Sequence, residues 1–148
     1  MSQNKNASGF PTATATALAS FLTRIAGRWV NIPAALVQPT HLVTSDKTAN
    51  YTVLAAETGT TFTNYGAIAT ITFALPPAVV GLHYRFVVLA SSGTSWQLRV
   101  DPNGTETIGA GTSGQYQWAD ALREVLHIAC FETGKWVILN AQGTWTAA

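Results

Sequence analysis

Cys130 and His127 are the residues of this sequence whose types could form a nucleophile and its general base. A thiolate–imidazole pair needs the two side chains within hydrogen-bonding reach of one another. The two residues are three positions apart in a segment that alternates like a β-strand, and side chains at that spacing point to opposite faces. The spacing therefore favours Cys130 as a small core residue rather than a nucleophile.

Metal ligation is a second chemistry that these side-chain types would allow. The histidines His41, His83 and His127 are scattered along the sequence, and the single cysteine excludes a zinc site built from several thiolates. The carboxylates mostly flank expected turns, where capping and turn stabilisation account for them. There is also no Gly-x-Ser-x-Gly, His-Glu-x-x-His or Walker-type glycine–lysine motif. The sequence therefore predicts no metal, no cofactor and no enzymatic activity.

The five tryptophans raise the alternative of sugar stacking. Trp96 and Trp136 alternate in register with apolar residues, so we expect them in the core. Trp118 and Trp145 are freer, and Trp118 stands in the polar stretch 114–118. A glycan is therefore an alternative ligand.

Few charges and a net charge near zero limit the partners of the chain. Only 10% of its 148 residues are charged, against about 25% in an average soluble domain, and the formal charge is +1. Such a chain has no global field to attract nucleic acid or an anionic membrane. No apolar run reaches the ~18 residues that would span a bilayer, and the sequence start lacks the order of a secretory signal. We expect neither nucleic acid nor a membrane as a partner.

Alternation of apolar and polar residues predicts an all-β fold. Ala69, Ile71, Phe73 and Leu75 share one face of an expected strand that two prolines end. Comparable segments are 51–55, 60–63, 68–75, 83–90, 95–100, 122–131 and 135–140, with shorter ones at 105–108 and 114–118. Strands at this spacing indicate a β-sandwich over residues 47–148, which we expect to be jelly-roll-like.

Several of these segments are apolar on both faces, although a two-layer sandwich in water normally turns polar residues outward. A second apolar face must be covered, either by loops and the N-terminal residues or by another copy of the chain. We expect a homo-oligomeric interface. Its predicted residues are Val87, Leu89, Val125, Phe131, Val137 and Leu139.

Residues 1–46 form an arm whose composition differs from the rest. Lys5, Arg24 and Arg28 lie in it, and no carboxylate precedes Asp46. Five apolar residues have the spacing of one face of a helix of about three turns. They are Leu18, Phe21, Leu22, Ile25 and Trp29. An isolated helix this short is marginal in water, so we expect it to pack on its own sandwich or on another chain.

Short segments of the body follow one another in a moderately specific order. They are 51–53, 58–64, 66–67, 71–76, 81–82, 84–87, 98–102, 106–108, 135–137 and 143–145. In this order they resemble a β-sandwich module that is frequent in structural proteins of tailed bacteriophages. The resemblance covers about residues 47–146, whereas residues 1–46 match no pattern of that family.

In that family the module occurs in capsid decoration (cement) proteins and in tail-fibre or tailspike parts, commonly as a trimer. The resemblance therefore implies a virion structural protein without enzymatic activity, made in the host cytoplasm. A short arm plus one module favours a decoration protein on the outer capsid surface, with the major capsid protein and further copies of itself as partners. We expect the arm, with Arg24 and Arg28 beside its apolar stripe, to attach to the capsid. The alternative is a fibre-tip or carbohydrate-binding module that contacts the host cell.

Overall fold

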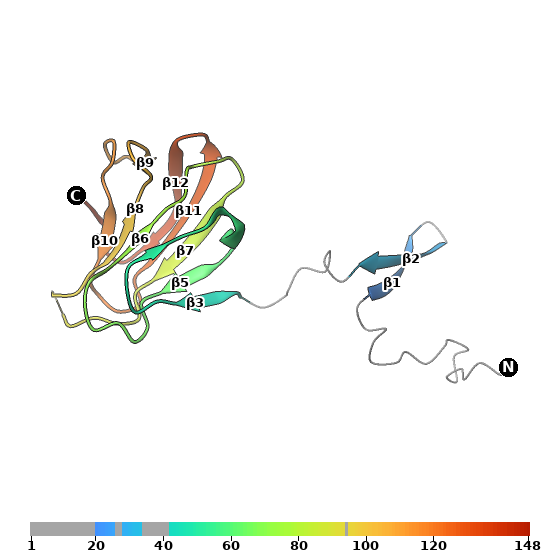
Figure 1. The fold of residues 1–148 in the computed structure, drawn as a ribbon, viewed down its shortest axis with the longest axis horizontal. Coiled ribbons are helices and arrows are strands. Elements are labelled where there is room, and N and C mark those ends of the chain that lie inside the picture. Colours follow the sequence, from blue (N-terminus) through green and yellow to red (C-terminus); the bar gives the residue numbers. More distant parts are fainter. Residues whose placement is uncertain (1–19, 26–27, 34–41, 94) are drawn as a thin grey trace. The chain divides into compact units, whose positions relative to one another are not determined.

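The structure is a computed structural model that describes residues 20–25, 28–33, 42–93 and 95–148, the first two segments as backbone only (Figure 1). Its described elements are β-strands apart from one 3-10 turn, η3 (Ala55–Glu57). The predicted all-β class is confirmed. The chain divides into two compact units, Met1–His41 and Leu42–Ala148. The boundary between them therefore falls after residue 41, rather than after residue 46 as the composition suggested.

The arm contains two antiparallel strands, β1 (Ser20–Ile25) and β2 (Arg28–Pro33), where a helix was predicted. The helix prediction is wrong over these residues, while Leu18 lies outside the described ones. Ile25 pairs with Arg28, so only two residues connect the strands, and the sequence there is Ala26-Gly27. The β-branched and aromatic residues of 28–33 favour a strand, and a two-residue connection with glycine is typical of a hairpin.

The body, residues 42–148, contains two sheets. In the six-stranded sheet the order is β3-β5-β7-β11-β12-β9, and in the five-stranded sheet it is β13-β10-β8-β6-β4. The first sheet contains β3 (Thr44–Asp46), β5 (Thr61–Thr63), β7 (His83–Val87), β9 (Thr107–Ile108), β11 (Val125–Glu132) and β12 (Lys135–Gln142). The second contains β4 (Tyr51–Thr52), β6 (Ile71–Ala74), β8 (Leu98–Asp101), β10 (Gln117–Ala119) and β13 (Thr146–Ala147). Every predicted strand segment contains a strand, whereas β3 and β13 were not predicted.

Successive strands from β3 to β8 alternate between the two sheets, so the chain winds like a β-solenoid. Strands β3, β5 and β7 are parallel neighbours in one sheet, and β4, β6 and β8 are parallel neighbours in the other. Antiparallel strands follow, since β11 pairs with both β7 and β12, and β10 pairs with both β8 and β13. The jelly-roll prediction is therefore wrong, because a jelly roll is built from antiparallel Greek keys.

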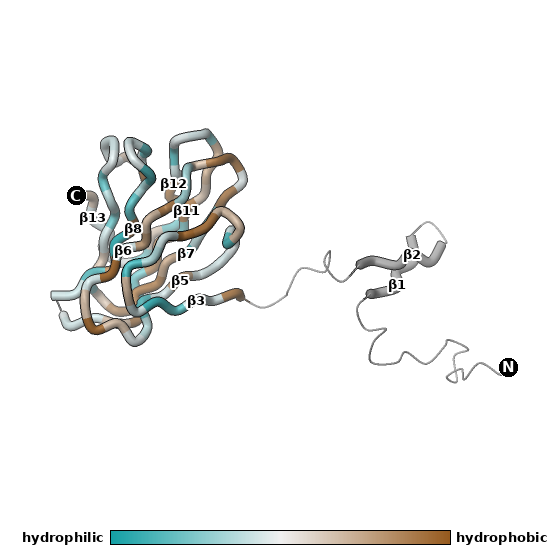
Figure 2. Tube along the Cα trace, in the orientation of Figure 1, coloured by the Kyte–Doolittle hydropathy of each residue, from teal (hydrophilic) through white to brown (hydrophobic). Residues whose placement is uncertain are grey.

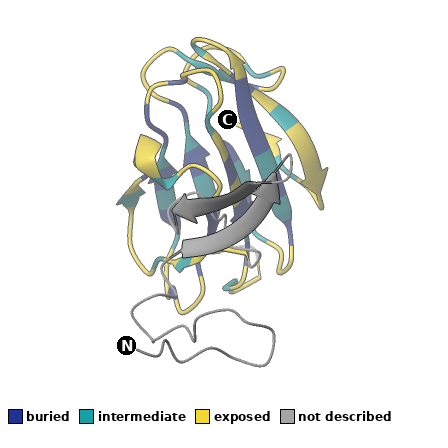
Figure 3. Cartoon of the chain, turned by 90° about the vertical axis from the view of Figure 1, so that its right-hand side faces the viewer, coloured by how far each residue is buried: buried dark blue, intermediate teal, exposed yellow. Residues whose placement is uncertain are grey.

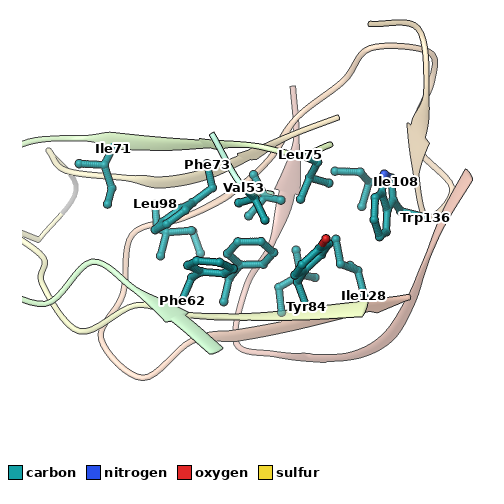
Figure 4. Packing of buried hydrophobic residues seen from close by; sticks show 14 of the residues in the cluster. Val53, Phe62, Ile71, Phe73, Leu75, Tyr84, Leu98, Ile108, Ile128 and Trp136 are labelled. Carbon is teal, nitrogen blue, oxygen red and sulfur yellow. The ribbon is translucent and has the colours of Figure 1, made fainter. Parts of the chain in front are cut away.

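The core lies between the two sheets, where their inward side chains meet (Figure 4). Hydrophobic residues occupy long stretches of the body strands, and the buried ones lie mainly in those strands (Figures 2 and 3). Phe62 of β5 is the centre of an aromatic group, with ring centroids 5.6 Å from Phe73 and 5.8 Å from Phe86. Tyr84 and Trp136, 5.6 Å apart by ring centroids, extend this group along the sheet. The body thus has a complete core of its own.

Buried or turn-side carboxylates stabilise the connections between strands, as their positions beside turns suggested. Glu57 accepts hydrogen bonds from the Tyr51 hydroxyl at 2.8 Å and the Leu54 amide at 2.9 Å. Glu106 accepts from the Ala78 amide at 2.9 Å. The Glu124 carboxylate is buried and accepts from the amides of Ala121 and Thr144, so it joins the loop before β11 to the loop after β12.

Replacing Glu124 with glutamine is expected to lower the free energy of unfolding by about 1–3 kcal/mol. The amide group retains one acceptor oxygen, and its NH2 group then faces a backbone N–H that loses its partner. Urea unfolding followed by circular dichroism measures the change. The matched control is Glu132→Gln, because Glu132 makes an exposed ion pair with Lys135 that is worth under about 1 kcal/mol. Equal effects of the two substitutions would contradict the role given to Glu124.

Candidate functional site

The outward face of the six-stranded sheet carries the most unusual surface of the described body. Along β7 the exposed and half-buried residues are His83, Arg85 and Val87, which alternate with the buried Tyr84 and Phe86. The register with β11 places Ala129, His127 and Val125 opposite them in that order. Side chains of directly opposite residues are neighbours on one face of a sheet, so these six residues form a continuous surface.

An apolar hollow of about 340 Å³ lies where β11 and β12 meet the loop before β7. Its apolar lining includes Val80, Leu82, Ala129, Phe131 and Leu139. Phe131 and Leu139 at its rim are 63% and 48% exposed. A volume in this range accommodates a large side chain or a small ligand. The hollow and its rim together form an apolar area that is exposed to water on the described body.

Five of the six predicted interface residues lie on this outward face. Val137 is opposite Ala129 in the β11–β12 register, and Leu139 falls in the irregular part of the register between Ile138 and Asn140. Val87 and Val125 face one another at the other end of the sheet and are half-buried. The structure thus brings together Val87 and Val125, which are 38 positions apart in the sequence. Leu89, the sixth, is exposed beyond the end of β7.

A second hollow, of about 160 Å³, adjoins the first and is less apolar. Because three basic side chains line it, we call it the basic hollow. Its lining residues are Leu42, Gly59, Thr61, His83, Arg85 and His127. The rings of His83 and His127 are 6.3 Å apart by centroids and lie edge to face. Both histidines also line the apolar hollow, so they mark the border between the apolar and the basic parts of the face.

The sequence did not predict the grouping of His83, Arg85 and His127, because the histidines are far apart along the chain. Alternation alone puts His83 and Arg85 on the face opposite Tyr84 and Phe86. What the sequence lacks is the pairing of β7 with β11, which sets His127 opposite Arg85. The pairing joins strands separated by three other strands in the chain, and no local signal specifies it.

Burial lowers the pKa of His127 below its usual value, and the neighbouring Arg85 and His83 lower it further. The folded state therefore favours the neutral imidazole. For a base with a lowered pKa, the contribution to stability is complete above the unfolded pKa of about 6.5 and is lost as the pH falls toward the folded pKa.

We expect the free energy of unfolding to decrease as the pH falls from about 7.5 to about 5.5. Substituting His127 with glutamine should reduce this slope, because glutamine does not acquire a charge in that interval. Urea unfolding at a series of pH values measures both chains. An unchanged slope in the variant would assign the pH dependence to other groups.

Cys130 belongs to the core, whereas His127 is on the outward face, so the two do not form a catalytic pair. The Cys130 thiol donates to the Glu132 carbonyl at 3.2 Å, and burial raises the pKa of the thiol. These observations confirm Cys130 as a core residue. Among the described residues no three His, Cys, Asp or Glu side chains group as metal ligands, and His41 lies outside those residues.

The loop 109–114 matches the motif Gly-x-Gly-x-x-Gly, which in dinucleotide-binding proteins joins a strand to a helix. Here it lies between β9 and β10, so no helix N-terminus is available to bind a pyrophosphate. The motif therefore lacks the structural context in which it binds a dinucleotide.

The tryptophans divide differently from the prediction. Trp136 is buried in the core as expected, while Trp96 is only half-buried. Trp145 packs against the core, and Trp118 is half-buried in β10. A stacking platform built from exposed Trp118 and Trp145 is therefore not favoured.

No protein-family model matches this sequence, and no curated protein is similar to it. The described chain contains no helix that is long and apolar enough to span a membrane. Functional inference therefore depends on the fold and on the outward face of the six-stranded sheet.

Proposed function

We propose that this protein is a decoration (cement) protein that binds the outer capsid surface of a tailed bacteriophage as a homotrimer. The observation that carries the proposal is the uncovered apolar face on a body whose core is already complete. A large exposed apolar area on a soluble domain marks an interaction surface. The collinear segments that resemble the phage β-sandwich module give that surface its context.

In this proposal the apolar rim of the hollow packs against further copies of the chain, and the border that His83 and His127 mark stays open. Phe131, Leu139 and Val137 supply the apolar contacts, since fully burying a large apolar side chain contributes about 1.5–3 kcal/mol. The arm, a separate unit with Arg24 and Arg28 and no carboxylate, then attaches to an acidic surface of the major capsid protein. The protein acts without catalysis, metal or cofactor.

Stabilisation of the shell follows from mass action. A protein that binds assembled capsid and not disrupted capsid stabilises it by RT ln(1 + [L]/Kd) per site. Three arms on one trimer raise the effective concentration of the second and third after the first has bound. A trimer can therefore hold neighbouring capsid subunits together even if each arm binds weakly.

The test is to add purified protein to capsids that lack it and to measure bound protein and the temperature of capsid disruption. Saturation at a fixed number of copies per capsid, with a higher disruption temperature, supports the proposal. Saturable binding to bacterial cells or to glycans, with no binding to capsids, would support the fibre-tip or carbohydrate-binding alternative instead.

A further inference from the structure

Three groups that can carry positive charge line the basic hollow. Arg85 of β7 is directly opposite His127 of β11, and His83 is the next outward residue along β7. The hollow of about 160 Å³ is several times the volume of one water molecule, about 30 Å³, so a carboxylate-sized group fits in it.

The described residues that surround His127 include no acid. Strand β7 contributes Arg85 and His83, β5 contributes Thr61 opposite Arg85, and β12 contributes Asn140 opposite His127. The one ion pair between described residues, Lys135–Glu132, involves none of these cations. The positive side chains of the hollow therefore have no counter-ion within the described body.

The carboxylates of the chain are largely occupied elsewhere. The sequence has seven, none of them before Asp46. Five bind their own body through hydrogen bonds or an ion pair, namely Asp46, Glu57, Glu106, Glu124 and Glu132. The remaining two, Asp101 and Asp120, end or follow strands of the five-stranded sheet. A second copy of the chain thus offers only these two unoccupied carboxylates, both on the other sheet, and a different molecule is the better source of a counter-ion.

We infer that Arg85, His83 and His127 form a binding site for a carboxylate side chain of a protein partner. The inference rests on the proposed function, in which the partner is the acidic surface of the capsid. A guanidinium binds a carboxylate through two parallel hydrogen bonds, and each protonated imidazole adds a charge-assisted one. One arginine and two histidines match a single carboxylate, whereas a nucleic-acid backbone needs an extended row of cations.

The site makes the affinity for a carboxylate depend on pH. The affinity changes with pH in the direction opposite to the stability of the free protein. Without a ligand, the lowered pKa of His127 makes the free energy of unfolding decrease as the pH falls. A bound carboxylate favours the charged imidazole and raises that pKa again. Affinity for a carboxylate should therefore rise as the pH falls from about 7.5 to about 5.5, while stability of the free protein falls.

The experiment uses the full chain and three probes, namely the peptides tetraglutamate and tetraglutamine and the sugar acid tetragalacturonate. Nuclear magnetic resonance follows the imidazole protons of His83 and His127 during titration at both pH values. We expect tetraglutamate to raise the titration midpoint of His127 and to bind more tightly at the lower pH, with tetraglutamine inert. Arg85→Gln should weaken binding about tenfold or more, since a charged hydrogen bond is worth roughly 1.5–3 kcal/mol.

Arg99→Gln is the matched control, because Arg99 belongs to the five-stranded sheet and lies over the Tyr116 ring. Binding of tetraglutamate that Arg85→Gln weakens and Arg99→Gln does not would support the site. Lack of any tetraglutamate binding, equal binding of tetraglutamine, or tighter binding of tetragalacturonate would overturn it.

The same variants separate this site from the proposed function. If the protein binds no capsid but tetraglutamate binding depends on Arg85, decoration is wrong and the carboxylate site stands. If capsid binding is the same for the unchanged chain and for Arg85→Gln at both pH values, and tetraglutamate is inert, the site is wrong and decoration stands.

Discussion

Val137→Asp is expected to convert the proposed trimer to a monomer at micromolar concentration. Val137 is 42% exposed in the free body and lies opposite Ala129 on the apolar part of the outward face. An interface that covers this face would bury the new carboxylate without a partner, at a cost of several kcal/mol. Each 1.4 kcal/mol changes the association constant about tenfold, so the loss exceeds a thousandfold.

Sedimentation velocity measures the mass of the assembly, and circular dichroism shows whether the variant is folded. The control is Ile68→Asp, which adds the same charge at a side chain that is 80% exposed and lies in the loop between β5 and β6. The control should remain a trimer. A monomeric unchanged chain, or a trimeric Val137→Asp variant, would show that this face is not the interface between copies.

Strand positions could be predicted from the sequence because burial imposes a local rule. In β6, Ile71 and Phe73 are buried and alternate with half-buried residues, and two prolines end the apolar segment, so spacing and breakers locate the strand. The short strands β3 and β13 could not be found in this way. Neither strand has a buried residue or a side chain packed against the core, so burial imposes no apolar pattern on them.

The direction of neighbouring strands could not be predicted, and this is why a jelly roll was expected. Alternation says which side of a strand faces the core and nothing about whether the neighbour is parallel or antiparallel. The parallel pair β5–β7 joins Phe62 to Phe86, which are buried in either arrangement. Likewise the helix in the arm was inferred from spacing alone, although the sequence around Gly27 also fitted a hairpin.

The candidate site shows the same division. Its apolar part was predicted because Val137 and Leu139 are apolar although they lie on the face of the strand opposite the core-facing Trp136. This departure from the usual alternation is visible within one segment. Its basic part was not, because Arg85 and His127 meet only through the pairing of two strands that are distant in the sequence.

Deleting residues 1–41 is expected to leave a folded, trimeric body that no longer saturates capsids. The body is a compact unit with a complete core, so its fold does not require the arm. The apolar face that we propose as the trimer interface belongs to the body and is retained. What is lost is the proposed attachment unit, and with it the gain expected from three linked sites.

Within the arm, Trp29→Ala should weaken capsid binding far more than Arg28→Ala. Burying a large apolar side chain in a partner contributes about 2–3 kcal/mol, or about 30- to 150-fold in affinity. An arginine at a solvated rim contributes under about 1 kcal/mol. The two residues are neighbours in β2, so the pair is a matched comparison. Bound protein per capsid, measured against free concentration, gives the affinities.

Each outcome of the deletion separates one role of the arm from another. A truncated chain that fails to fold would make the arm part of the folding unit, against the division after residue 41. A truncated chain that folds and decorates capsids with unchanged affinity would place attachment on the body. Weak residual binding that strengthens at low pH and disappears with Arg85→Gln would be the contribution of the basic hollow alone, because His83, Arg85 and His127 all belong to the body.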